Sequence, residues 1–290
     1  MRVIPDSELI INPDGSIYHL HLRPEHVSDT IITVGDQERV AEVSKHFDSI
    51  ECRIQNREFL THTGMLGSKR ITVISTGIGT DNIDIVFNEL DALTNIDIQT
   101  RMVKKDIKSL TIIRLGTSGA VNEEIPIDSI VISEAGIGLD SLMAYYRHDN
   151  TPQEIQLAAA FSQHIRPAFS NLNPYATFAD AGLIRQFESL GHKGLTVTAP
   201  GFYAPQGREL RAANQSTEFI KLINSFRHLN SHITNLEMET AGIYALGAML
   251  GHRCLSVNAI LAHRITNRFS EQPQKVVDAM ICKALGILVS

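Results

Sequence analysis

Residues 110–119 read LTIIRLGTSG, and this stretch indicates both the fold class and the place of a site. Its first half is almost continuously apolar and β-branched, which is typical of a strand covered on both faces of a sheet. Arg114 stands at the end of this run, where burying it without a partner would cost free energy. Ligand sites of α/β proteins lie at the carboxyl ends of strands, so Arg114 and Thr117 could hold phosphate beside two glycines. A structural ion pair of Arg114 is the alternative.

Similar apolar runs recur along the chain and alternate with helical patterns. The strand candidates are residues 30–34 (TIITV), 71–75 (ITVIS), 129–133 (SIVIS), 254–262 (CLSVNAILA) and, more weakly, 195–198 (LTVT). Helices are predicted from a capping box at residues 151–154 to about residue 164, over residues 237–250, and over residues 273–288. This alternation predicts an α/β layer structure. Since no Pro/Gly/Ser-rich linker divides the sequence, we expect residues 1–290 to form one domain.

The composition excludes several classes of protein. The 26 basic and 32 acidic residues give a net charge of −6, which argues against nucleic acid as a partner but leaves room for a local anion pocket. No apolar stretch approaches the roughly 18 to 20 residues that span a bilayer, and no signal-peptide pattern is present, so we expect a cytoplasmic location without membrane contact.

The widely spaced Cys52, Cys254 and Cys282 predict buried free thiols. The polar residues 94–109 predict a solvated connection.

Two glycine-containing turns follow predicted strands. In residues 34–40 (VGDQERV), Gly35 lets a ligand approach the backbone, and the N–H groups that open a helix favour anions. Arg39, about one helical turn on, could complete an oxyanion site with its planar donors. The alternative is a plain strand-to-helix turn with Asp36 as N-cap. Residues 76–79 (TGIG) are a weaker signal, because a tight turn explains them equally well.

Residues 202–208 (FYAPQGR) combine side chains that suit a planar ligand. Gln206 offers a donor and an acceptor, whereas Arg208 offers donors only. Phe202 could stack on a ring beside them, so the three could read the amide edge of a small heterocycle. The alternative is a loop whose arginine starts a helix.

Glu237 and Glu239 open the predicted buried helix at residues 237–250. Carboxylates favour the positive end of a helix, which is a sufficient structural reason for one of them. The second could instead bind sugar hydroxyls. The sequence contains no zinc signature, Walker loop, GxSxG elbow or full dinucleotide fingerprint, so we expect no metal site.

Taken in chain order, these five segments resemble the nucleoside phosphorylase family of the purine/uridine type, and most closely its uridine branch. The likeness extends from about Tyr18 to the final helix. It implies a single-domain, three-layer α/β/α fold with a central mixed, partly barrel-like sheet. It also implies a pentosyltransferase that uses inorganic phosphate as cosubstrate and needs no cofactor.

The resemblance assigns roles to individual positions. The residues matching phosphate-binding positions are Gly35, Arg39, Arg57, Arg114 and Thr117. Those matching ribose-binding positions are His19, Glu237, Met238 and Glu239. Those matching base-binding positions are Phe202, Gln206, Arg208 and Arg264. Among these, Arg208, Glu239 and Arg114 match the catalytic residues, while Arg57 and His19 match residues that a neighbouring subunit donates.

The implied reaction is phosphorolysis of uridine, or deoxyuridine, to uracil and (deoxy)ribose 1-phosphate in pyrimidine salvage. Purine enzymes of the bacterial type carry an Asp near 23 residues past the ribose Glu, where this chain has Ala262. The arginines at positions 39, 57 and 114 favour phosphorolysis over hydrolysis. A phosphorylase for thymidine or a purine, a nucleosidase, and a non-catalytic nucleoside-binding protein are the alternatives.

The resemblance also implies an assembly. Because His19 and Arg57 match residues that serve a neighbour, we expect a homo-oligomer with shared active sites, a dimer at minimum and a hexamer by likeness to the bacterial relatives. In those relatives Glu58 and the segment after Gly79 hold potassium at a dimer interface. Here Asn82, within Thr80-Asp81-Asn82, replaces a Ser ligand, which argues against the ion. His263 replaces the usual Asn before Arg264, and its role is left open.

Overall fold

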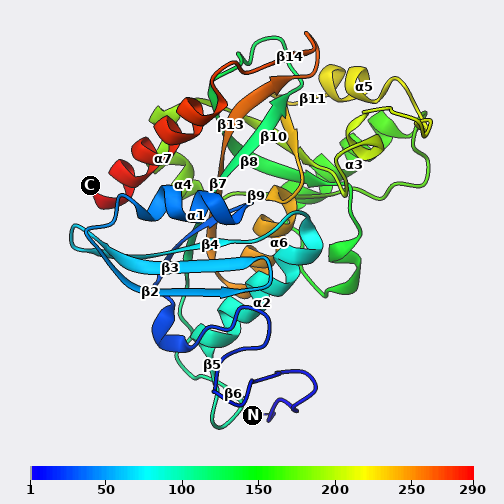
Figure 1. The fold of residues 1–290 in the computed structure, drawn as a ribbon. Coiled ribbons are helices and arrows are strands. Elements are labelled where there is room, and N and C mark those ends of the chain that lie inside the picture. Colours follow the sequence, from blue (N-terminus) through cyan, green and yellow to red (C-terminus); the bar gives the residue numbers. More distant parts are fainter. Residues whose placement is uncertain (1) are drawn as a thin grey trace.

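Residues 2–290 are described by a computed structural model, and they form an α/β fold on one twelve-stranded mixed sheet (Figure 1). The strands of this sheet are β1 (Thr30–Val34), β2 (Ser49–Asn56), β3 (Phe59–Leu66), β4 (Lys69–Ser75), β7 (Thr111–Ala120), β8 (Ile130–Gly138), β9 (Tyr175–Phe178), β10 (His192–Thr198), β11 (Arg227–His228), β12 (Ser231–Glu237), β13 (Arg253–His263) and β14 (Arg268–Phe269). The α-helices are α1 (Gln37–Ser44), α2 (Thr80–Asn95), α3 (Pro152–Ile165), α4 (Ala181–Phe187), α5 (Phe219–Ser225), α6 (Thr240–Leu250) and α7 (Pro273–Val289). The polar residues 94–109 hold a separate strand pair, β5 (Ile96–Asp97) and β6 (Met102–Val103).

Part of the sheet closes on itself into a barrel-like ring. β7 pairs with β13, β13 with β8, β8 with β10 and β10 with β12, and β12 returns to β7. Register shifts interrupt the pairing along β10 and β13, and such bulges bend strands enough for a sheet to curve. β1, β4, β3 and β2 continue the sheet away from the ring. The expected α/β fold with a mixed, partly barrel-like sheet is confirmed.

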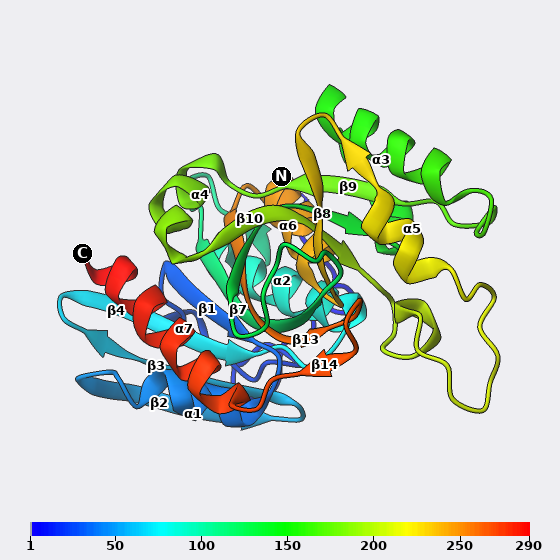
Figure 2. The same ribbon diagram turned by 90° about the horizontal axis from the view of Figure 1, so that it is seen from above.

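Helices cover the sheet on both sides. Seen from above, α1 and α7 lie on one side of the β1–β4 region, and α2 and α6 lie on the other (Figure 2). α3 packs against β9 and α5 against β12, beside the ring. The apolar α6 is buried along most of its length and contacts β8 and β13. Within residues 2–290, none of the helices has the length and apolar character that crossing a membrane would need.

The strand that contains Arg114, β7, is longer than expected. Its apolar run ends at Leu115, but β7 continues to Ala120, so Arg114 lies within the strand rather than at its end. Pairing with β13 from Gly116 to Ala120 holds this second half extended, and Gly119 also pairs with β12. Closure of the ring therefore extends this strand beyond its expected end.

The start expected for the buried helix was wrong. Glu237 is the last residue of β12, and α6 begins at Thr240. Other predicted boundaries agree better: Thr151 and Glu154 form the expected capping box of α3, and Asp36 caps α1.

The cysteines are free, as expected, but they are not all buried. Cys254 is buried in β13, Cys52 is partly covered, and Cys282 is exposed. The reason is that Cys282 lies off the apolar stripe with which α7 faces the core.

Candidate active site

A cleft of about 410 Å³ opens where several strands end and the loop of residues 202–208 begins. β7, β12 and β13 each contribute residues to its wall, and Gly35 and Asp36 join it directly after the end of β1, as expected for a site near the carboxyl ends of strands. The residues that line it are Gly35, Asp36, Arg39, Ile78, Arg114, Thr117, Ser118, Gly119, Phe202, Gln206, Arg208, Leu236, Glu237, Met238, Glu239, Leu261, Ala262 and Phe269. Tertiary folding thus brings the chemistry-bearing segments of the sequence into one cavity.

Arg114 is the buried charge at the base of this cleft. Its Nη2 donates to Glu239 Oε2 at 2.5 Å and lies 3.2 Å from Glu237 Oε2, and its Nη1 donates to Asn258 Oδ1 at 2.7 Å. Burial disfavours the guanidinium charge, but the two carboxylates outweigh it and raise the pKa of Arg114. A Cβ at position 116 would lie 1.8 Å from Arg114 Nη1, so glycine there makes room for the folded-back side chain.

Glu237 and Glu239 have different tasks at the head of α6. The Glu237 carboxylate accepts from the backbone N–H of Glu239 and of Thr240, and from the Thr198 hydroxyl, so it caps the helix. Glu239 instead turns into the cleft, where its carboxylate also accepts from Gly79 N at 2.8 Å. Burial raises the pKa of Glu239, and nearby Arg114 opposes that rise. Two carboxylates therefore share one guanidinium, and only one of them is committed to the helix.

Arg39 lines the same cleft from the first turn of α1, close enough to Arg114 and Glu239 to feel their charges. Asp36 caps α1 by accepting from Arg39 N at 2.8 Å, and its other oxygen pairs with Arg39 Nη2 at 2.8 Å. Burial lowers the pKa of Arg39, although Asp36 acts in the opposite sense. No atom lies within 4 Å of the point where a Cβ at Gly35 would stand, so the backbone there is open to a ligand. The structure therefore shows Asp36 as the N-cap of α1, and it also places Gly35 and Arg39 in the lining of the cleft.

The loop of residues 202–208 closes the opposite wall. Arg208 Nη1 donates to Gln206 Oε1 and to Phe202 O, both at 2.7 Å, and its guanidinium stacks 3.7 Å from the centre of the Phe202 ring. Arg264, directly after β13, binds this loop by donating to Gln206 O at 2.8 Å. Burial and then the charge of Arg264 lower the pKa of Arg208 to about 10. Ala262 completes this wall and pairs with the exposed Phe269.

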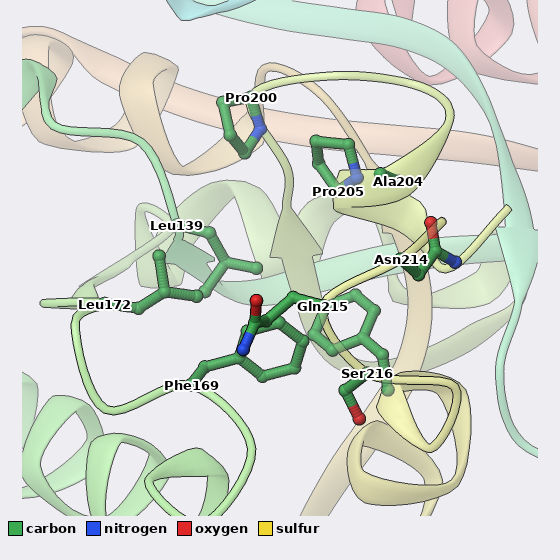
Figure 3. A pocket seen from close by; sticks show the side chains of 10 residues that line it. Leu139, Phe169, Leu172, Pro200, Ala204, Pro205, Asn214, Gln215 and Ser216 are labelled. Carbon is green, nitrogen blue, oxygen red and sulfur yellow. The ribbon is translucent and has the colours of Figure 1, made fainter. Parts of the chain in front are cut away.

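A second, apolar cavity of about 230 Å³ lies against the other side of the same loop (Figure 3). Figure 3 shows Pro205 of the loop, and Pro200 just before the loop, above Leu139, Phe169 and Leu172. The loop that carries Gln206 is therefore backed partly by empty space rather than by close packing.

Two of the expected site residues lie elsewhere. His19 and Arg57 are absent from the cleft lining of residues 2–290. His19 is half-buried and lines a separate pocket with Tyr18 and Glu89, whereas Arg57 is exposed. The Tyr18 ring contacts the His19 ring edge-on, with centroids 4.7 Å apart, and Arg57 Cζ stands 5.4 Å from the centre of the Tyr18 ring. Asn56 Nδ2 donates to His19 O at 2.7 Å. We call this group, together with Glu89, the His19 patch.

Several residues that line the cleft or support its side chains were not predicted from the sequence. Asn258 holds Arg114, and its signal was an amide in the middle of the apolar run 254–262. Ile78, between two glycines, is 66% exposed and lines the cleft. Leu261 and Phe269 join the base-side wall but carry no polar group that a motif search would detect.

Asn82 and Glu58, which the sequence connected with an ion, both pack around Gly77. A Cβ on Gly77 would lie 2.3 Å from Asn82 Nδ2 and 3.3 Å from Glu58 Cγ. In the part of the chain that the structure describes, no three His, Cys, Asp or Glu side chains gather as metal ligands would.

Comparisons with known proteins agree with this architecture. The sequence profile of the Phosphorylase superfamily matches residues 29–289. The uridine phosphorylase of Thermococcus kodakarensis is 29% identical over 278 residues, covering 95% of this chain and 87% of the relative. A DeoD-type purine nucleoside phosphorylase of Colwellia psychrerythraea is 27% identical, with 84% and 86% coverage.

Solved structures lead to the same family. A crystal structure of a Trypanosoma brucei nucleoside phosphorylase, described as showing uridine phosphorylase activity, superimposes with a TM-score of 0.84. That protein is 28% identical in sequence, and the match covers 96% of this chain and 99% of the other. Together with the profile match, the barrel-like sheet and the charged cleft, this shows that the chain belongs to the phosphorylase superfamily, as an enzyme of the nucleoside phosphorylase type, a pentosyltransferase.

Proposed function

We propose that this enzyme phosphorolyses uridine, and also deoxyuridine, to uracil and the corresponding pentose 1-phosphate. The observation that carries the proposal is the pairing of opposite walls in one cleft. Arg39 and Arg114 stand at one end, and Gln206 and Arg208 face them from the loop. Between them Glu239 presents a buried carboxylate to a sugar.

The arginine end suits phosphate. Arg39 offers a planar donor fork beside the open backbone at Gly35, and Thr117 adds a hydroxyl from β7. Arg114 adds positive charge to this end of the cleft, and it also orients the Glu239 carboxylate by donating a hydrogen bond to it. Phosphate held here would attack C1′ of the ribose from the face opposite to the base. Met238 and Glu239 would line the sugar between them, with Glu239 accepting from the 2′ and 3′ hydroxyls.

The loop end suits a pyrimidine leaving group. As the bond between C1′ and the base breaks, positive charge grows on the sugar and negative charge on uracil. Arg208 and Gln206 would donate to the uracil edge as that charge develops, while Phe202 stacks beside it. The new bond joins C1′ to a phosphate oxygen, and the proton of hydrogen phosphate ends on uracil. Positioning and electrostatics supply the catalysis, without a covalent enzyme intermediate.

The base-side wall favours a pyrimidine over a purine. Ala262, Leu261 and Phe269 form it together with the loop, and the residues described at this wall include no carboxylate to protonate a purine ring nitrogen. The DeoD-type relatives keep the purine alternative open. A nucleosidase would not need the arginines at positions 39 and 114. A protein that only binds nucleosides would not need a phosphate site beside the base pocket.

One turnover panel tests these alternatives. Uridine, deoxyuridine, thymidine and inosine are each followed spectrophotometrically with and without phosphate. We expect phosphate-dependent turnover of uridine and deoxyuridine and weak turnover of inosine. Equal rates without phosphate would instead identify a nucleosidase, and faster turnover of inosine would identify a purine enzyme.

The working unit that we propose is a homo-oligomer, at minimum a dimer, with the hexamer as the larger form. Support comes from His19 and Arg57, which match residues donated by a neighbouring subunit in the resembled family and do not line the cleft described by residues 2–290. We further propose a cytoplasmic role in pyrimidine salvage with nucleoside and phosphate as the partners. Inorganic phosphate is then the cosubstrate, with no cofactor.

A further inference from the structure

Glu89 on α2 makes an unusually complete set of contacts with the His19 segment. Its carboxylate accepts from the backbone N–H of His19 at 3.0 Å and of Leu20 at 2.8 Å. The same carboxylate contacts His19 Nδ1 at 2.6 Å. The Glu89 side chain is 12% exposed and that of His19 is 29% exposed, so these bonds are partly shielded from water.

This arrangement fixes how the imidazole carries its hydrogen. An ionised carboxylate only accepts hydrogen bonds, so Nδ1 is the ring nitrogen that bears hydrogen. In the neutral ring, Nε2 then carries the lone pair and acts as an acceptor. Within residues 2–290, Nε2 makes no hydrogen bond, which leaves it available at the surface.

Further contacts within the His19 patch hold the backbone at His19 and cover one side of its ring. Asn56 binds the His19 carbonyl oxygen, and the Tyr18 ring stands edge-on against the imidazole. Arg57 contacts the same Tyr18 ring and follows Asn56 directly, in the two-residue turn between β2 and β3 with φ at 55°. His19 and Arg57 therefore present their polar ends as one pre-arranged unit.

We infer that Glu89 is a positioning residue that sets nucleoside specificity. In the proposed oligomer, where His19 matches the ribose-binding residue that a neighbouring subunit donates, Glu89 would present His19 Nε2 as an acceptor to the 5′-hydroxyl of the nucleoside in that neighbour's cleft. A nucleoside that lacks the 5′-hydroxyl gains nothing from this acceptor. The inference rests on the proposed function, because it takes the ligand to be a nucleoside.

The test compares uridine with 5′-deoxyuridine in the wild type and in Glu89→Gln. We expect kcat/KM for uridine to fall about tenfold, mainly through KM, because a charge-assisted hydrogen bond is lost. The value for 5′-deoxyuridine should stay within about twofold. In a His19→Ala background, Glu89→Gln should add no further loss for uridine, since both changes remove the same interaction.

The matched control is Asp84→Asn on the same helix. Asp84 accepts from the Tyr146 hydroxyl and from Asn88, and it makes no hydrogen bond with His19 among the described residues. Asp84→Asn should leave the preference for uridine over 5′-deoxyuridine unchanged. Equal losses on both substrates in Glu89→Gln would reduce Glu89 to a structural residue and overturn the inference.

A spectroscopic measurement separates the inference from the proposed function. ¹⁵N chemical shifts, assigned by difference with His19→Ala, report which ring nitrogen carries hydrogen. We expect hydrogen on Nδ1 in the wild type and a mixture in Glu89→Gln. Hydrogen on Nε2 in the wild type would overturn the inference even if uridine is turned over. If uridine is not phosphorolysed at all, the proposed function fails and the specificity role of Glu89 fails with it, whatever the tautomer.

Discussion

The cleft and the His19 patch are built in opposite ways. In the cleft, charged side chains project from strand ends and are satisfied within the chain, as Arg114 is by Glu239 and Asn258. In the patch, loops bring His19 and Arg57 together on the surface, where internal contacts fix their geometry but leave their outer polar groups free. The cleft is a finished cavity, whereas the patch is pre-arranged for something outside the chain. This difference fits the proposal above that a neighbouring subunit completes each site.

The largest effect should come from the cleft itself. We expect Arg208→Ala to lower kcat for uridine roughly 10²- to 10³-fold, because it removes a donor aimed at developing charge on the base. Steady-state kinetics measure this, with Arg211→Ala, an exposed arginine just beyond the same loop, as the control. Wild-type turnover in Arg208→Ala would show that the loop does not contact the leaving group.

Mixing two inactive variants tests whether the patch serves another subunit. Arg208→Ala damages the cleft and keeps the patch, while Arg57→Ala damages the patch and keeps the cleft. In a mixed dimer one of the two sites combines the intact cleft with the intact patch, so the purified mixed dimer should have about half of wild-type activity. The mixed species is isolated with two affinity tags. Activity no higher than that of the separate variants would mean that each chain completes its own site.

Arg39→Ala should produce a smaller and more selective defect. Loss of this donor fork is expected to raise KM for phosphate about tenfold and to leave KM for uridine nearly unchanged. Lys45→Ala, at the far end of α1, provides a control for charge. A matching rise in KM for uridine would place Arg39 against the nucleoside rather than against phosphate.

The smallest effect concerns pH. Burial raises the pKa of Glu239 above the ordinary 4.5. The carboxylate must be ionised to accept from the ribose hydroxyls, so activity should fall as pH decreases through that raised pKa. A pH profile of kcat/KM for uridine should therefore show its acid limb above pH 4.5. With 2′,3′-dideoxyuridine, which lacks both hydroxyls, that limb should weaken, and an unchanged limb would assign it to another group.

Local sequence was sufficient where the structure depends on local rules. Continuous β-branched runs mark β1, β4 and β13, and the capping box at Thr151 marks the start of α3. Apolar runs did not predict the strands whose formation depends on pairing with residues far along the chain. β2 and β3 have alternating or partly polar sequences and became strands only by pairing with each other and with β4. Likewise β12 was not predicted as a strand, and its last residue, Glu237, was assigned to the following helix, because the pairing of β12 with β10 and β7 depends on residues distant in sequence.

The sequence by itself determined which residue types are available: an arginine in the central strand, a glutamine and arginine in one loop, and two glutamates before an apolar helix. It therefore predicted the α/β class and the family resemblance. Only the tertiary structure decided that Glu237 caps α6 while Glu239 turns to Arg114, and that His19 lies against Glu89, 70 residues away, outside the cleft. The physical reason is that the partner of a buried or half-buried polar group is selected by the closure of the ring and the packing of α2. Those contacts join residues that are distant in sequence, and no local pattern records them.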